Sequence, residues 1–161
     1  IRNIVADGRL AIEKRRLSAN KNAEFCELTS MVMIQDDKGN VLVQEQQNPN
    51  GYTLPTGHIE LGESFVQSAI HGVKEKTGLD VDQLKLCGTK QFTSSDGCRH
   101  IVFLYKTNVF NGNKNEESHW ISLSKIHDYK LISGLDDVLD VFKELDCNEL
   151  YYNAQYQLKK Y

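Results

Sequence analysis

The chain has 161 residues, of which 40% are hydrophobic and 25% are charged, and its net charge is −3. This balance is typical of one globular domain with a sizeable core, and it excludes the general basic field that attracts nucleic acid or an anionic membrane. No apolar run approaches the roughly 20 residues of a membrane span, and the charged start lacks the apolar region of a signal peptide. The four cysteines are widely spaced and form no C-x-x-C pair. Their spacing disfavours a zinc site or redox motif and predicts a reduced, cytoplasmic protein.

The first part of the chain predicts an extension followed by a hairpin. Residues 1–22 are polar and basic and are expected to form an N-terminal extension. Residues 27–34 (ELTSMVMI) and 41–45 (VLVQE) have the composition of strands and flank the turn signal DDKGN. We therefore predict that these two strands pair as a hairpin, and that the polar residues 46–52 form a loop.

Residues 64–77 predict a helix with signals at both ends. Ser64 and Gln67 have the spacing of a capping box, and Gly78 stands where a C-terminal glycine belongs. A buried apolar stripe at helical spacing is predicted from Phe65, Val66, Ala69, Ile70 and Val73.

The second half of the chain predicts strands, a second helix and a tail. Strands are predicted at residues 84–92, 100–109 and 119–123. A second helix is predicted at 134–146, and residues 147–161 are predicted to form a C-terminal helical tail. This order of elements predicts one layered α/β domain with a mixed sheet over residues 23–146.

The segment GHIELGE at 57–63, with the helix after it, carries the chemistry. Hydrolysis of a phosphoanhydride needs an activated water and neutralised charge at phosphorus, and divalent cations held by carboxylate oxygens supply both. Positions 72, 75 and 76 have the i, i+3, i+4 relation that places side chains on one helix face. Only Glu75 is acidic among them, because the other two positions hold Gly72 and Lys76.

The segment resembles the box of the Nudix hydrolase family, G-x5-E-x7-R-E-U-x-E-E-x-G-U, where U is a bulky aliphatic residue. The matching residues are Gly57, Glu63, Val73, Glu75, Gly78 and Leu79. The flanking sequences LPTGHIE at 54–60, VLVQ at 41–44 and WISL at 120–123 extend the resemblance. It implies a Nudix-type α/β/α sandwich with a mixed β-sheet. It also implies hydrolysis of a nucleotide pyrophosphate bond, in a nucleoside diphosphate linked to another moiety.

The departures from the box are His71 for the arginine, Gly72 for the first glutamate of the metal-binding triad and Lys76 for the last. The resemblance implies that Glu75 remains a metal ligand and that the carbonyl of Thr56 is a second one. It also implies a supporting catalytic role for Glu63, which pairs with position 71 in the family. The Lys76 ammonium could occupy the space of the cation or contact a phosphate as a point charge.

Gly72 has two interpretations. A glycine inside a helix costs about 1 kcal/mol relative to alanine, so helix stability alone does not select it. Either the backbone needs a close approach at this position, or the constraint on a catalytic glutamate has lapsed. We favour lapse.

Other acids could restore part of the metal site. Glu60 is close in sequence, and Glu116 and Glu117 lie in the loop where the resemblance suggests an auxiliary acid. The alternative is that these loop carboxylates are simply solvated. Two functions are therefore open. One is a weakened hydrolase that uses Mg2+ or Mn2+. The other is a catalytically inactive Nudix-fold protein that binds a nucleotide or a partner, without a metal cofactor. A nucleotide-type small molecule is the expected partner and a homodimer is left open, whereas no membrane or nucleic-acid partner is expected.

Several further residues receive a structural interpretation. The five histidines lack zinc-binding H-x-x-x-H spacing, and Cys98 beside Arg99 is interpreted as a strand-edge cysteine rather than a nucleophile. The C-terminal tyrosines are expected to pack against the domain, with base stacking or a dimer interface as alternatives. Asn48, Tyr52 and Phe92 are candidates for base recognition by their loop positions.

Overall fold

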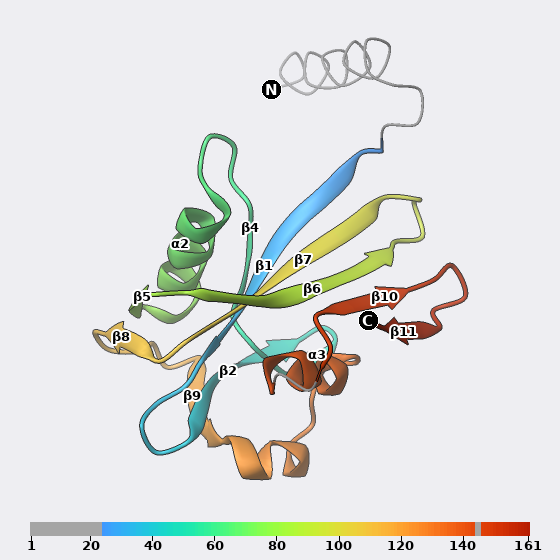
Figure 1. The fold of residues 1–161 in the computed structure, drawn as a ribbon. Helices are drawn as coiled ribbons and strands as arrows, with labels where there is room; N and C mark the ends of the chain where they lie inside the picture. Colours follow the sequence, from blue (N-terminus) through green and yellow to red (C-terminus); the bar gives the residue numbers. More distant parts are fainter. Residues whose placement is uncertain (1–23, 144–145) are drawn as a thin grey trace.

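The computed structural model describes residues 24–143 and 146–161, so the predicted extension at 1–22 lies outside the described residues. The strands are β1 (Cys26–Ile34), β2 (Asn40–Gln47), β3 (Asn50–Thr53), β4 (Thr56–His58), β5 (Asp80–Asp82), β6 (Lys85–Thr93), β7 (Arg99–Thr107), β8 (Val109–Asn111), β9 (Ser118–Ser122), β10 (Glu149–Tyr152) and β11 (Leu158–Lys160). The helices are α2 (Phe65–Thr77), the 3-10 helix η1 (Leu123–Asp128) and α3 (Leu135–Phe142) (Figure 1).

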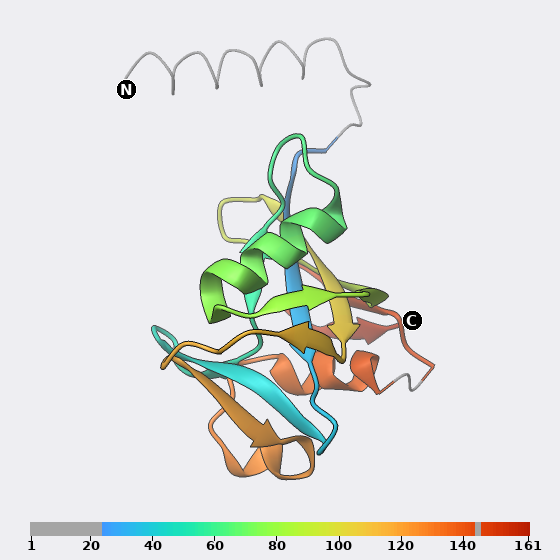
Figure 2. The same cartoon turned by 90° about the vertical axis from the view of Figure 1, so that its left-hand side faces the viewer.

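The largest sheet is mixed and lies between two helical layers. Its strand order is β11-β10-β6-β7-β1-β4, with β1 parallel to β7 and β6 parallel to β10. Val32 and Ile34 of β1 pack with α2, whereas Met31 and Met33 pack in the cluster that contains α3. Because successive side chains of a strand point to opposite faces, α2 and α3 cover opposite faces of this sheet (Figures 1 and 2). The predicted α/β/α sandwich with a mixed sheet is confirmed.

The predicted hairpin of the first two strands is wrong. Strand β1 pairs with β7 and β4, whereas β2 pairs with β3 and β9 in a separate three-stranded sheet. Only one isolated bridge, from Gln35 to Val41, joins the ends at the turn. Both edges of β1 are thus occupied by other strands, so β2 turns away into its own sheet.

The prediction of a helical tail is also wrong. Residues 149–160 form the antiparallel pair β10–β11, and β10 adds to β6 in parallel. Leu150 is fully buried between half-buried neighbours, which is the alternation of a strand. Its tyrosine neighbours favour a pleated surface. The turn is closed by Asn153, whose Oδ1 accepts the amide N–H groups of Gln155 and Gln157 at 2.9 Å each.

The predicted loop at 46–52 is wrong, because β2 extends to Gln47 and pairs with β3, which begins at Asn50. The other predicted strands and the second helix are present with shifted bounds. The antiparallel pair β6–β7 surrounds the predicted turn, and α3 is shorter than the predicted helix at 134–146. In the described part of the chain, no helix is long and apolar enough to cross a membrane.

Candidate active site

The helix α2 is fixed at both ends by its own sequence, as predicted. The amide N–H of Gln67 donates to Ser64 Oγ at 3.1 Å, and the amide N–H of Ser64 donates to Gln67 Oε1 at 3.0 Å, which completes the capping box. Gly78 ends the helix at a φ of +82°, and its N–H donates to the Lys74 carbonyl at 2.9 Å. Only glycine adopts this backbone conformation without strain.

A polar network ties the loop before α2 to the helix. His71 Nδ1 lies 2.8 Å from Glu63 Oε1, and Ser68 Oγ donates to Glu63 Oε2 at 3.2 Å. The same Ser68 hydroxyl, which is buried, accepts the amide N–H of Glu60 at 2.9 Å. His71 therefore pairs with Glu63 from the position that holds arginine in the Nudix box. The loop keeps its carboxylate anchored although the arginine is missing.

The backbones of α2 and β4 touch at two glycines. A Cβ built on Gly72 would lie 3.2 Å from Gly57 Cα and 3.9 Å from the carbonyl oxygen of Thr56. A Cβ on Gly57 would lie 3.1 Å from Gly72 Cα. The close approach that was one of the two interpretations of Gly72 is therefore present. The Thr56 carbonyl also lies beside the helix position from which the first carboxylate of the triad is missing.

The C-terminal end of α2 is bordered by the loop that precedes β9. The amide N–H of Asn115 donates to the Thr77 carbonyl at 2.7 Å, and Asn115 Nδ2 donates to the Lys76 carbonyl at 2.7 Å. Glu116 and Glu117 follow directly, so the loop contacts place them near the turn of α2 that carries Glu75. Lys76 itself lies in the last helical turn, where the partial negative charge of the helix end favours a cation.

The acids singled out by the sequence are solvent-facing. Glu60, Glu75, Glu116 and Glu117 are all exposed, and Glu63 is engaged with His71 and Ser68. Among the described residues, the metal-binding side chains that gather within 4.8 Å of one another are Glu27, Cys98 and His100. The box acids are not part of that cluster, and a cation at α2 would rely on single carboxylates and backbone oxygen.

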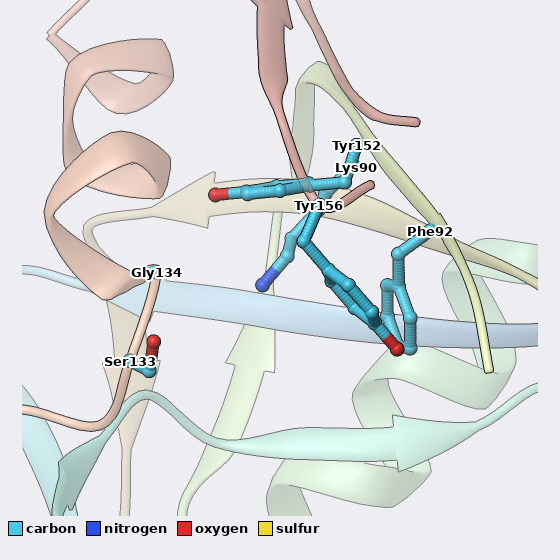
Figure 3. Close-up of a pocket in the computed structure, with 6 residues that line it drawn as sticks. All are labelled: Lys90, Phe92, Ser133, Gly134, Tyr152 and Tyr156. Atoms are coloured by element: carbon cyan, nitrogen blue, oxygen red, sulfur yellow. The ribbon is translucent and has the colours of Figure 1, made fainter. Parts of the chain in front are cut away.

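A cavity of about 190 Å³ opens on the sheet face opposite α2 (Figure 3). It is lined by Lys90, Phe92, Ser133, Gly134, Tyr152 and Tyr156. Lys90 Nζ lies 5.4 Å from the centre of the Tyr152 ring and 5.7 Å from that of Phe92, within the range of cation–π attraction. An aromatic wall with one cation suits a planar, polar or anionic group.

The charge state of this cavity is set by burial and by one carboxylate. Burial lowers the pKa of the Lys90 ammonium, and the nearby Asp137 opposes that shift. Burial and Asp137 together raise the pKa of Tyr152 to about 12, so its hydroxyl stays protonated and donates to Asp137 Oδ2 at 3.1 Å. Asp137 therefore orients the tyrosine as a wall of the cavity.

The sequence pointed to part of this cavity and missed the rest. Phe92 and the C-terminal tyrosines had been considered for base recognition, and Tyr152 and Tyr156 do line the cavity. Lys90 was not selected, since its position follows from the register of β6 and β10, which the sequence does not display. Ser68 was also missed, although its place one turn from His71 on a polar helix face was a usable signal.

The fold and the loop-helix define a class of protein, and the comparisons with known proteins agree on it. The structure is similar to the MutT protein of Bacillus halodurans, with a TM-score of 0.66 at 17% identity over 82% of this chain and 94% of that one. It is also similar to the NUDIX domain of Shewanella oneidensis NrtR, solved with ADP ribose, with a TM-score of 0.60 at 18% identity over 83% and 98% of the two chains. These likenesses establish the fold.

The family follows from the sequence comparisons. The NUDIX domain model matches residues 27–142, which is most of the chain. A dihydroneopterin triphosphate diphosphatase of Escherichia coli is 28% identical over 104 residues, or 63% of this chain and 67% of that protein. The uncharacterized Nudix hydrolase YvcI of Bacillus subtilis is 26% identical over 147 residues, or 83% and 91%. This chain belongs to the Nudix hydrolase family, whose members act on pyrophosphate bonds.

Proposed function

We propose that this protein hydrolyses the pyrophosphate bond of a nucleoside diphosphate linked to another moiety, and that the loss of two box glutamates weakens the reaction. The observation that carries the proposal is the anchored loop-helix. Glu63 is held by His71 and Ser68, and Gly57 packs on α2 so that the Thr56 carbonyl lies beside the helix. A loop that served only as a linker would not need this network.

The donors at α2 suit a hard divalent cation but hold it weakly. Mg2+ and Mn2+ prefer carboxylate and carbonyl oxygens, and the Glu75 carboxylate and Thr56 carbonyl are of that kind. Glu60, Glu116 and Glu117 are proposed as substitute ligands, because Gly72 and Lys76 supply none. When bound, such an ion activates a water and neutralises charge at phosphorus. The role proposed for Glu63 is to hold the loop in position.

The aromatic cavity is proposed as the site of the base or of the linked moiety. Phe92, Tyr152 and Tyr156 offer faces for stacking, and Lys90 offers a donor to a carbonyl or an anionic group. Strand β6, which carries Lys90 and Phe92, is three strands from the edge strand β4. Three strand spacings are roughly 14 Å, so the ligand would be elongated and would pass the edge of β4 to reach α2.

We propose the cytoplasm as the location of this protein, from its cysteines and independently of the activity. All four cysteines are free thiols in the structure, which agrees with the cytoplasmic location proposed from the sequence.

A second function is favoured by one specific observation, the lysine at position 76. Its ammonium lies on the exposed side of the last turn of α2, where the family places a carboxylate. There it could contact a phosphate as a point charge without any metal. The protein would then be a catalytically inactive module that binds a nucleotide or a partner.

The test is a hydrolysis screen with Mg2+ or Mn2+ against a metal-free control. The substrates would be nucleoside triphosphates, dinucleoside polyphosphates, nucleotide sugars, ADP-ribose and dihydroneopterin triphosphate, with Glu75→Gln as the matched variant. Metal-dependent turnover that Glu75→Gln abolishes would support the hydrolase. No turnover, together with metal-independent nucleotide binding by calorimetry, would contradict it and support the binding module.

A further inference from the structure

A second group of metal-binding side chains lies away from α2, where β1 and β7 begin. Glu27 of β1, His100 of β7 and Cys98 just before β7 place their ligand atoms within 4.8 Å of one another. Strands β1 and β7 lie side by side (Figure 1), and their parallel register sets Glu27 opposite His100. Strand alternation places Glu27 on the same face as Met31, opposite the face covered by α2. The cluster therefore lies on the other face of the sheet from α2, and it touches the box segment only through His58, which contacts Glu27.

The ligand atoms of the cluster lie close to the separations of ligands around one ion, all within 4.8 Å of one another. Glu27 Oε2 lies 3.6 Å from His100 Nδ1 in the cluster, and Glu27 Oε1 lies 3.4 Å from His58 Nδ1 beside it. Both are longer than a direct hydrogen bond of about 2.7–3.2 Å. Two ligands bonded at about 2.0–2.1 Å to a tetrahedral ion lie roughly 3.3 Å apart. Small side-chain rotations would therefore bring the cluster to the geometry of a bound metal.

The surrounding residues hold these side chains in place. His100 Nε2 lies 3.2 Å from Ser94 Oγ, which leaves Nδ1 directed at Glu27, and the Ser94 hydroxyl donates in turn to the Asp96 carboxylate. The amide N–H of Cys98 donates to Asp96 Oδ1 at 3.1 Å. Partners of this kind fix the tautomer and orientation of a metal-binding histidine.

The cluster also adjoins the aromatic cavity. The His100 ring stacks on Phe92, with ring centres 4.8 Å apart and planes inclined by 4°. Phe92 is one wall of that cavity. Ordering of His100 would therefore also order this wall.

We propose that Glu27, Cys98 and His100 bind one transition-metal ion of the Zn2+ class, with water in the fourth position. A thiolate, an imidazole and a carboxylate together select such an ion over Mg2+, which prefers oxygen ligands alone. As the Sγ–metal bond forms, the thiol proton of Cys98 is released to solvent. His58 is a positioning residue that holds the other oxygen of Glu27. The site does not depend on hydrolysis at α2.

The test is a titration of the metal-free full chain with Co2+, monitored by absorption spectroscopy. Co2+ is used because its absorption depends on its ligands, whereas Zn2+ has no visible absorption. One equivalent is expected to give the visible bands of a tetrahedral site and a near-ultraviolet thiolate band that Cys98→Ser removes. In competition with a zinc chelator, His100→Gln and Glu27→Gln are expected to weaken Zn2+ binding by at least about tenfold.

The controls are a cysteine and a histidine elsewhere in the fold. Cys147→Ser and His127→Gln, the latter from a histidine 2.9 Å from Asp136, are expected to leave the spectrum and affinity unchanged. Glu75→Gln should also leave them unchanged, which separates this site from the box. Far-ultraviolet circular dichroism checks that each variant folds. A Co2+ spectrum without a thiolate band would overturn the proposal, and so would unchanged Zn2+ affinity in folded Glu27→Gln and His100→Gln.

Discussion

The contact between Gly72 and Gly57 makes a prediction that opposes simple helix propensity. Replacing Gly72 by alanine in a free helix would gain about 1 kcal/mol. In this protein the new Cβ would lie 3.2 Å from Gly57 Cα, which is tighter than ordinary van der Waals contact. The obstacle is backbone of β4, which is held by its pairing with β1. Overpacking of this kind costs about 1–3 kcal/mol.

We therefore expect Gly72→Ala to lower the free energy of unfolding by about 1 kcal/mol instead of raising it, which is a fall in Tm of about 2–4 °C. The assay is urea unfolding followed by fluorescence of Trp120, the only tryptophan. The matched control compares Glu75→Ala with Glu75→Gly. Position 75 is exposed in the same helix, so the difference in unfolding free energy between these two variants reports helix propensity alone. Alanine should be the more stable at position 75 and the less stable at position 72.

A stabilisation by Gly72→Ala of the size seen at position 75 would refute this reasoning. It would mean that β4 relaxes without cost and that Gly72 reflects only a lapsed constraint on the family's glutamate. The double variant with Gly57→Ala sharpens the test. Its two methyl groups would meet each other, so its destabilisation should exceed the sum of the single effects.

Three further predictions concern single side chains. His71→Ala should remove one of the two partners of Glu63, leaving Ser68, and should loosen the loop. Faster amide hydrogen exchange of residues 58–64 would show this, and unchanged exchange would contradict the network. Ser64→Ala should lower the free energy of unfolding by about 1 kcal/mol, because it removes the capping box. An unchanged free energy of unfolding in urea would contradict a stabilising role of this cap. Asp137→Asn should lower the pKa of Tyr152 from about 12, since the opposing charge is gone while burial remains. Because the pKa of Tyr152 is raised in the folded state, the protonated tyrosine contributes to the free energy of unfolding below about pH 10, and this contribution is lost as the pH rises through about 12. An ultraviolet titration of tyrosine that Asp137→Asn leaves unchanged would contradict this prediction.

The features that the sequence predicted well are those encoded locally. The helix α2 was predictable because Ser64, Gln67 and Gly78 specify its ends. Its predicted buried stripe is confirmed at Ala69 and Val73 and is wrong at Phe65 and Val66, which are exposed. The pair β6–β7 was predictable from the turn between its strands. The Nudix fold was predictable because the loop-helix spans a short, ordered motif.

The features that the sequence did not predict depend on which strands become neighbours. The turn sequence between residues 34 and 41 is compatible with a hairpin and with diverging strands. The two strands diverge because β1 pairs with β4 and β7 instead of β2. The tail became a strand because β6 offered a free edge to Leu150. The cluster of Glu27, Cys98 and His100 comes from parallel register across about 70 residues of chain, so no local spacing reveals it.

The most direct test of the account is the affinity of α2 for Mn2+, measured by electron paramagnetic resonance on the chain and on Lys76→Glu. The structure leaves Glu75 as the carboxylate of the triad, with a cation at the next position. At about 4 Å from a divalent ion, exchanging one positive for one negative charge is worth about 4 kcal/mol in water, or roughly 1,000-fold. The account predicts tighter Mn2+ binding of that order in Lys76→Glu, lost again when Glu75→Gln is added. Equal Mn2+ affinity in the two proteins would contradict the claim that α2 retains a weakened metal site.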